Sequence, residues 1–285
     1  MQGDKKTLFD IRDGRAMVSL GPLSPKKYCT FSCPFCYVHA DFSSYESFTP
    51  SQIFDWLNSK ESSSFDIVYV SGDTDSFAPP RTLEGLELLE CLIKLKKDIL
   101  FTTRMVFNDN HLDRLESLAE QGAKNGNLII GCTSIAQLEQ PYLEPKPIPP
   151  PYLRIKQLSD LHDRGIVSVL AMRPFLPVVP LTEYENLLDL AIGKADIVLG
   201  EVWYADQAGK LEQKVLGGKL QNYVQKKMDF DSNESIWHVY MADDVREMCE
   251  QWSLSTGIPF FMRSKQAIEW IRNSLSINSI QKRVK

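Results

Sequence analysis

The sequence predicts an α/β protein built as a partial (β/α)6 TIM-like barrel with a C-terminal α/β extension. Short runs of β-branched and apolar residues alternate with amphipathic helical patterns six times, at intervals of about 30–40 residues. Polar loops follow the strand-like runs, and no linker divides the alternation. Such a pattern gives a parallel sheet with right-handed crossovers. In folds of this kind, active-site loops lie at the carboxyl edge of the sheet.

Four of the six predicted strands lie in the first half of the chain. They are Arg15–Gly21, Phe65–Ser71, Asp98–Arg104 and Asn127–Ser134. The helix after the first strand opens with Thr49 as N-cap and Pro50 at its first position. The next helix is predicted over Thr82–Lys97, where leucines recur at helical spacing. Asp109 is the predicted N-cap of the third helix.

A proline-rich loop, residues 144–151, precedes the fourth helix, which is predicted over Pro151–Arg164 with Gly165 at the C′ position. The fifth strand is predicted over Ile166–Met172, and Thr182 is the predicted N-cap of the helix that follows it. The sixth strand begins at Asp196 and continues to Tyr204. We therefore expect residues 1–204 to form the barrel core.

Residues 205–285 are predicted to be an extension of the same domain that closes the barrel. Ala205–Glu234 reads as polar and irregular, Met241–Thr256 as a helix and Ile258–Met262 as a short strand before a final helix. The last 25 residues hold six Lys or Arg and one Glu. This basic end indicates either a solvated helix and tail or a contact with nucleic acid or phosphate.

The composition is that of an ordinary globular protein. The chain has 285 residues, of which 43% are hydrophobic and 24% charged, with a net charge of −5. This charge gives no global basic footprint for nucleic acid, although it leaves a local groove open. The sequence contains no apolar run of transmembrane length and no signal-peptide core. We therefore expect a cytoplasmic protein with reduced thiols and no membrane contact; the oligomeric state is not predicted.

Three cysteines, Cys29, Cys33 and Cys36, lie close together with the spacing C-x3-C-x2-C. Thiolates this close converge on one point and suit a metal or a cluster. Three ligands leave one coordination position open, which indicates a catalytic rather than a structural centre. Two non-enzymatic alternatives remain. One is a zinc module with His39 as the fourth ligand, and the other is a cluster-bearing redox or scaffold protein.

The three-cysteine motif, with Tyr37 directly after it and a βα series around it, resembles the signature of the radical S-adenosylmethionine (SAM) superfamily. Three further segments resemble its spore photoproduct lyase and DNA repair photolyase branch. They are Gly72–Pro79, Leu143–Arg154 and Gly165–Pro177. The first departs from the branch pattern because Ser76 replaces a proline and Ala78 a glutamine.

This resemblance implies a [4Fe-4S] cluster held by the three cysteines, with SAM bound to the fourth iron. An electron from the cluster would cleave SAM, and the resulting 5′-deoxyadenosyl radical would take a hydrogen atom from the substrate. The electron donor would be a protein such as flavodoxin or ferredoxin. The branch suggests a lyase or repair activity on a nucleic-acid lesion or a nucleotide. A small metabolite or a peptide is the alternative substrate.

The resemblance also assigns candidate SAM ligands. Tyr37 would lie along the adenine, and the small polar residues from Ser71 to Asp75 suit the amino group. Arg104 and Arg154 are candidates for the carboxylate, because guanidinium groups pair with carboxylates in a bidentate manner. Ser134 is a candidate for the ribose or the carboxylate. The small polar stretch proposed for the amino group consists of Ser71, Gly72, Asp73, Thr74 and Asp75.

Four further residues are candidates for chemistry on the substrate. Cys132 precedes Ser134 by two residues, so both point to the same face of a strand. It is therefore a candidate hydrogen-atom donor, with simple packing as the alternative. Arg173, Glu201 and Trp203 end later strands and are candidate substrate contacts.

Overall fold

The computed structural model describes residues 9–22, 29–39, 46–228 and 235–275. Its main sheet has the order β1-β2-β3-β4-β5-β6-β7-β11, and the strands from β2 to β11 are parallel. This arrangement confirms the predicted partial barrel. The strands are β1 (Asp10–Arg12), β2 (Arg15–Val18), β3 (Ile67–Val70), β4 (Asp98–Thr103), β5 (Ile129–Ser134), β6 (Val167–Phe175), β7 (Ile197–Val202) and β11 (Phe260–Phe261).

Helices follow the parallel strands as predicted, but two N-caps were wrong. Asn108, not Asp109, caps the third helix, because its extended backbone lets its side chain accept a hydrogen bond from the amide of His111 at 3.0 Å. The fifth helix begins at Leu181 after Pro180, so Thr182 lies inside it. The helices are α1 (Pro50–Asn58), α2 (Thr82–Leu92), α3 (Asp109–Lys124), α4 (Pro151–Asp163) and α5 (Leu181–Ala191).

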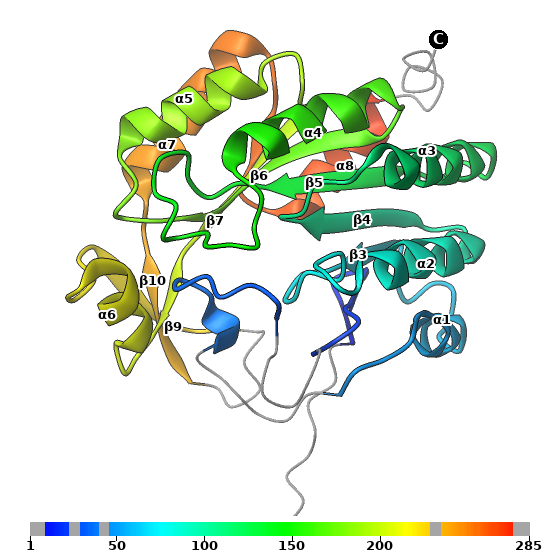
Figure 1. The fold of residues 1–285 in the computed structure, drawn as a ribbon, viewed down its shortest axis with the longest axis horizontal. Coiled ribbons are helices and arrows are strands. Elements are labelled where there is room, and N and C mark those ends of the chain that lie inside the picture. The colour runs from blue at the N-terminus through cyan, green and yellow to red at the C-terminus, as the bar shows by residue number, and fades with distance from the viewer. Residues whose placement is uncertain (1–8, 23–28, 40–45, 229–234, 276–285) are drawn as a thin grey trace, which may run out of the picture.

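Alternating side chains of the strands pack against different helices, because successive residues of a strand point to opposite faces. Val68, Val70 and Phe101 pack with α1, α2 and α3 in one core. Ile67, Leu100 and other residues of opposite parity form a second core with the last helix, α8 (Ser264–Ser274). Helices α2, α3 and α4 lie along the same side of the sheet in Figure 1.

The C-terminal extension is more regular than the sequence predicts. Ala205–Glu234 was expected to be irregular, but it contains the end of one strand, a helix and a second strand. The helix is only seven residues long and lies between Gly209 and Gly217, both with positive φ. A strand as exposed as β9 has no hydrophobic alternation for a sequence analysis to detect. The elements are β8 (Tyr204–Asp206), α6 (Lys210–Leu216), β9 (Tyr223–Lys227), β10 (Ile236–Tyr240) and α7 (Asp243–Thr256).

Strands β8, β10 and β9 form a small antiparallel sheet beside the main one. Figure 1 shows β9, β10 and α6 as a lobe below β7, next to the blue segment that carries the cysteines. Helix α8 packs on the second core, and its Arg272 pairs with Asp98 at the start of β4 at 2.7 Å. Within the described part of the chain, none of the helices combines the length and apolarity needed to cross a membrane. The basic tail, residues 276–285, lies outside the described residues.

Candidate active site

One pocket lies at the carboxyl edge of the parallel sheet and encloses about 880 Å³ of space that is partly open to solvent. Residues that end or follow β2 to β7 form its wall, as the fold predicts. The predicted site residues among them are Cys29, Cys33, Cys36, Tyr37, Ser71, Gly72, Asp73, Thr74, Asp75, Arg104, Ser134, Arg173, Glu201 and Trp203. Arg154 and Cys132 are not part of this wall.

The three motif cysteines are free thiols that face this pocket together. A tight turn holds two of them, since the Cys36 amide donates to the Cys33 carbonyl at 3.1 Å. Burial raises the pKa of all three thiols, that of Cys36 to about 12, and the nearby Arg104 opposes this shift. Coordination to iron would compensate the thiolate charge that burial disfavours.

The donor set is that of an iron–sulfur cluster, because three free cysteine thiols line one pocket. Among the described residues, no three His, Cys, Asp or Glu side chains form a group that could hold a metal ion. A four-iron cluster takes each thiolate at a different iron, so its ligands lie further apart than those of one ion. The side chain of His39, the candidate fourth zinc ligand, is outside the described part of the structure.

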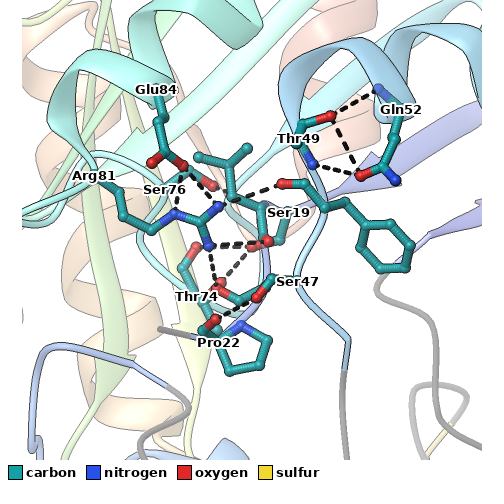
Figure 2. A network of polar contacts seen from close by, with 12 residues as sticks. Ser19, Pro22, Ser47, Thr49, Gln52, Thr74, Ser76, Arg81 and Glu84 are labelled. Carbon is teal, nitrogen blue, oxygen red and sulfur yellow. Dashed lines mark hydrogen bonds and ion pairs between the residues drawn. The ribbon is translucent and has the colours of Figure 1, made fainter. Parts of the chain in front are cut away.

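Arg81 fixes the two ends of the segment that carries the cysteines, as Figure 2 shows. Its Nη1 donates to the carbonyls of Leu20 and Gly21, both at 3.1 Å, and its Nη2 donates to the carbonyl of Phe48 at 3.3 Å. The Phe48 amide donates to the Leu20 carbonyl at 2.9 Å. The chain therefore leaves and rejoins the barrel at one anchored point.

The loop after β3 brings its backbone close to the pocket. Ser71 has a φ of 69°, and its hydroxyl accepts a hydrogen bond from the Ser76 amide at 2.9 Å. A side chain at Gly72 would meet Met17 at 2.8 Å and Tyr69 at 2.9 Å, so this position requires glycine. The loop is thus shaped to present small groups to a ligand.

The two aspartates of this loop have different surroundings. The carboxylate of Asp75 accepts hydrogen bonds from the Phe77 amide (2.9 Å), the Thr103 hydroxyl (2.9 Å) and the Arg104 amide (2.7 Å). It therefore joins the ends of β3 and β4. The carboxylate of Asp73 instead accepts a hydrogen bond from the Tyr37 hydroxyl at 2.5 Å. Burial raises the pKa of Asp73, and this hydrogen bond opposes the shift.

Tyr37 lies between the cysteine loop and the small sheet. Its ring meets the ring of Tyr204 edge-on at 6.3 Å and that of Trp237 at 6.4 Å. The neighbouring Trp203 is 1% exposed, and its indole N–H donates to the Phe35 carbonyl at 2.9 Å. The extension therefore packs directly on the cysteine loop, through the contact of Trp237 with Tyr37. The hydrogen bond of Trp203 serves this packing rather than a ligand.

The two arginines predicted for the SAM carboxylate share one buried partner, Glu144. Arg154 is fully buried and pairs with this carboxylate at 2.6 and 3.0 Å, and it also donates to the Ser134 carbonyl. Arg104 reaches Glu144 from the pocket side at 3.0 Å. Burial alone would raise the pKa of Glu144, but the two arginines lower it below its ordinary value. Arg154 thus lies behind the pocket wall and supports Ser134.

Another part of the wall combines three polar side chains. Arg173 Nη1 donates to the hydroxyl of Tyr69 at 3.1 Å, and its Nε lies 3.7 Å from Glu201. This Nε atom is buried and has no hydrogen-bond partner in the described structure. Sequence reasoning missed Tyr69 and Glu144. Tyr69 precedes Ser71 by two residues, so the period of the strand could have placed both on one face.

Cys132 lies beneath the pocket floor. It is 1% exposed, packs in the inner core of the barrel and lies beside Thr102 on the neighbouring strand β4. Thr102 contacts the hydroxyl of Tyr69 at 3.1 Å, and both residues line the pocket. Burial raises the pKa of Cys132 to about 12. The thiol is therefore protonated, and its strand neighbour Thr102 lines the pocket.

Comparison with protein families identifies the class of protein that this fold and site define. The model of the radical SAM superfamily matches residues 23–191. The chain therefore belongs to the radical SAM superfamily and is an enzyme of that kind. Its cofactors are accordingly a [4Fe-4S] cluster and SAM. A comparison with curated protein sequences finds no match.

Solved structures share the fold at low sequence identity. A single-site mutant of spore photoproduct lyase matches 90% of this chain and 79% of its own, with a TM-score of 0.63 and 14% identity. The lyase in complex with dinucleoside spore photoproduct matches with a TM-score of 0.60 and 14% identity, over 92% of this chain and 81% of that one. Streptococcus suis SuiB bound to its precursor peptide SuiA matches 85% of this chain but 47% of its own, with a TM-score of 0.58 and 14% identity.

Proposed function

We propose that this enzyme cleaves SAM reductively and abstracts a hydrogen atom from a nucleotide or a nucleic-acid lesion. The observation that carries the proposal is the common pocket, which the three cysteines, Arg173 and Glu201 all line. When bound, the cluster and SAM supply a carbon radical that takes a hydrogen atom from a substrate. The protein must therefore hold both molecules in one cavity away from solvent.

The cysteine side of the pocket is the proposed SAM site. Cys29, Cys33 and Cys36 would hold the cluster. Asp73 is the carboxylate suited to the SAM ammonium group, since protein donors already occupy Asp75. The remaining proposed contacts are Tyr37, Ser71, Gly72, Thr74 and Ser134, which all line the pocket.

The part of the wall formed by Arg173, Glu201 and Tyr69 is the proposed substrate site. The Nε of Arg173, which has no hydrogen-bond partner in the described structure, can donate to a carbonyl or phosphate oxygen, and Glu201, 3.7 Å from it, can accept from an N–H group. A nucleobase edge presents such neighbouring acceptors and donors. The similarity to spore photoproduct lyase, whose structure holds a dinucleoside photoproduct, supports this substrate class. Tyr69 and Thr102 connect this wall with Cys132, the proposed hydrogen-atom donor.

A peptide substrate is the second candidate, supported by the similarity to SuiB with its precursor peptide.

Deuterium transfer distinguishes a nucleotide substrate from a peptide substrate. The reconstituted enzyme is incubated with SAM, dithionite and UV-irradiated dinucleotides built from deuterated thymidine. We expect deuterium in the 5′-deoxyadenosine that is formed. SAM cleavage without label from the dinucleotides, but with label from deuterated peptides, would contradict the nucleotide proposal.

A further inference from the structure

Arg104 occupies a fixed position beside the cysteine loop. Its guanidinium lies 5.6 Å from the centre of the Phe35 ring, and Phe35 stands between Cys33 and Cys36 in the chain. Its Nε donates to Glu144 at 3.0 Å and its Nη2 to the Arg173 carbonyl at 2.9 Å. Two anchors and one ring therefore hold the charge at the cluster side of the pocket.

Glu144 does not neutralise Arg104, because Arg154 shares this carboxylate. Arg154 forms a bidentate pair with it, and both side chains are completely buried. Arg154, Glu144 and the partly exposed Arg104 together carry a formal net charge of +1 (two positive charges and one negative). Of the two arginines, Arg104 alone lines the pocket with the cysteines. In an interior of low dielectric, such a charge acts strongly on nearby ions.

We propose that Arg104 does not ligate SAM but acts electrostatically on the cluster and raises its reduction potential. Reduction adds one electron to a cluster that already carries three thiolates. A fixed positive charge nearby stabilises the more negative, reduced state, and net charge around a cluster is a main determinant of its potential. The inference rests on the cluster site of the proposed function.

The test is a dithionite redox titration of the reconstituted protein without SAM, followed by electron paramagnetic resonance. In the absence of SAM, the midpoint potential reports the surroundings of the cluster alone. We expect Arg104→Met to have a more negative potential than wild type and Arg104→Lys to restore it. Arg164→Met is the matched control, since it removes a surface arginine paired with Asp113 and Glu116.

Glu144→Gln provides a change of opposite sign. It removes the negative charge between the two arginines, so we expect a more positive potential. If Arg104→Met does not assemble a cluster, the sign of the Glu144→Gln shift decides. An unchanged potential in Arg104→Met, with weaker SAM binding, would overturn the inference and make Arg104 a SAM ligand. Shifts of the same sign in both variants would also overturn it.

This outcome is separate from that of the proposed function. A wild-type protein that assembles a cluster but transfers no deuterium would contradict the nucleotide proposal, and the potentials could still be compared. A cluster with normal deuterium transfer but no dependence of its potential on Arg104 would contradict only this inference.

Discussion

Asp73 and Asp75 are two residues apart, yet only Asp73 keeps a carboxylate that faces the pocket with a single protein donor described for it, the Tyr37 hydroxyl. The sequence predicted SAM contact for the whole stretch from Ser71 to Asp75. It could not distinguish the two aspartates, because the partners of Asp75 come from the end of a strand 28 residues away. Tyr37 thus contributes to the site through a hydrogen bond as well as through its ring.

Tyr37→Phe tests this contact. We expect SAM to bind roughly fivefold more weakly, since one hydrogen bond contributes about 1 kcal/mol. Burial raises the pKa of Asp73, and the Tyr37 hydrogen bond partly opposes this. The ionised form exists above the pKa, so SAM binding should weaken as the pH falls. In Tyr37→Phe the pKa of Asp73 rises further, so the pH at which SAM binding is half lost should be higher than in wild type.

Isothermal titration calorimetry of SAM against the reconstituted protein, repeated across the acidic and neutral range, measures this effect. Tyr142→Phe, at an exposed tyrosine outside the pocket, is the control. Equal pH midpoints in wild type and Tyr37→Phe would contradict the role given to Asp73.

Arg154→Met should destabilise the fold by about 3–5 kcal/mol, because it leaves the charge of Glu144 buried with one partner fewer. The pKa of Glu144 is lowered in the folded state by its arginines, against the effect of burial. Its contribution to stability is therefore present above the ordinary glutamate range and is lost as the pH falls through the lowered pKa. Urea denaturation at neutral and acidic pH measures both effects.

The surface variant Arg164→Met is the comparison, with an expected loss below about 1 kcal/mol. If both variants lose the same stability, the buried pair does not have the structural role assigned to it.

At the level of elements, the loop after β3 and the start of α2 hold the cysteine segment in place. Arg81 donates to carbonyls on both sides of that segment (Figure 2). The described part of the segment contains one short helix, at Tyr37–His39. We therefore expect Arg81 to help to hold the cysteines in position.

Arg81→Met removes the donor of three carbonyls, so we expect a loss of about 1–3 kcal/mol in the free energy of unfolding. We also expect less iron and sulfide bound per folded molecule after anaerobic reconstitution. Arg114→Met removes a half-exposed ion pair with Glu90 and should change neither quantity. Full cluster loading in Arg81→Met would show that the cysteine segment keeps its shape without this anchor.

The elements also show which sequence signals are reliable. Buried strands such as Ile67–Val70 and the capping box at Thr49 were predicted because burial and cap chemistry leave local patterns. The N-caps at Asn108 and Pro180 were missed by one and two residues, since several polar residues near a helix start can serve as caps. The exposed strand β9 leaves no such pattern.

At the scale of the whole molecule, the C-terminal helix α8 packs against the strands of the barrel. Its apolar residues Ala267, Ile268 and Ile271 pack against the inner face of the barrel strands. Its Arg272 pairs with Asp98, and Ser264 accepts a hydrogen bond from Arg15 at 2.9 Å. The extension thus contacts the barrel here, at the cysteine loop and through β11, which pairs with β7.

Ile271→Ala should reduce the free energy of unfolding by about 2–5 kcal/mol, because Ile271 is fully buried in the inner core. Glu269→Ala, on the exposed face of the same helix, should stay within about 0.5 kcal/mol of wild type. Chemical denaturation measures both. A small effect of Ile271→Ala would mean that α8 is not an integral part of the barrel core.

The sequence predicted the barrel, the convergence of the three motif cysteines and the shared edge of the site, because each depends on local spacing or on the rule for parallel sheets. It did not predict that Arg154 lies behind the pocket wall or that Trp203 donates to the cysteine loop. Nor did it predict that Tyr69 lines the pocket and that Glu144 pairs with both arginines. Those facts depend on contacts between residues far apart in the chain. No sequence signal distinguishes a side chain that lines the pocket from one of the same type that holds the pocket wall in place.

The most direct test of the account is SAM cleavage by the reconstituted protein with dithionite under anaerobic conditions. The wild type is compared with the variant in which Cys29, Cys33 and Cys36 are all replaced by alanine. Cys249→Ala, at a buried cysteine of α7, is the control. We predict 5′-deoxyadenosine from the wild type and the control, and none from the triple variant. Equal SAM cleavage by the triple variant would contradict the account.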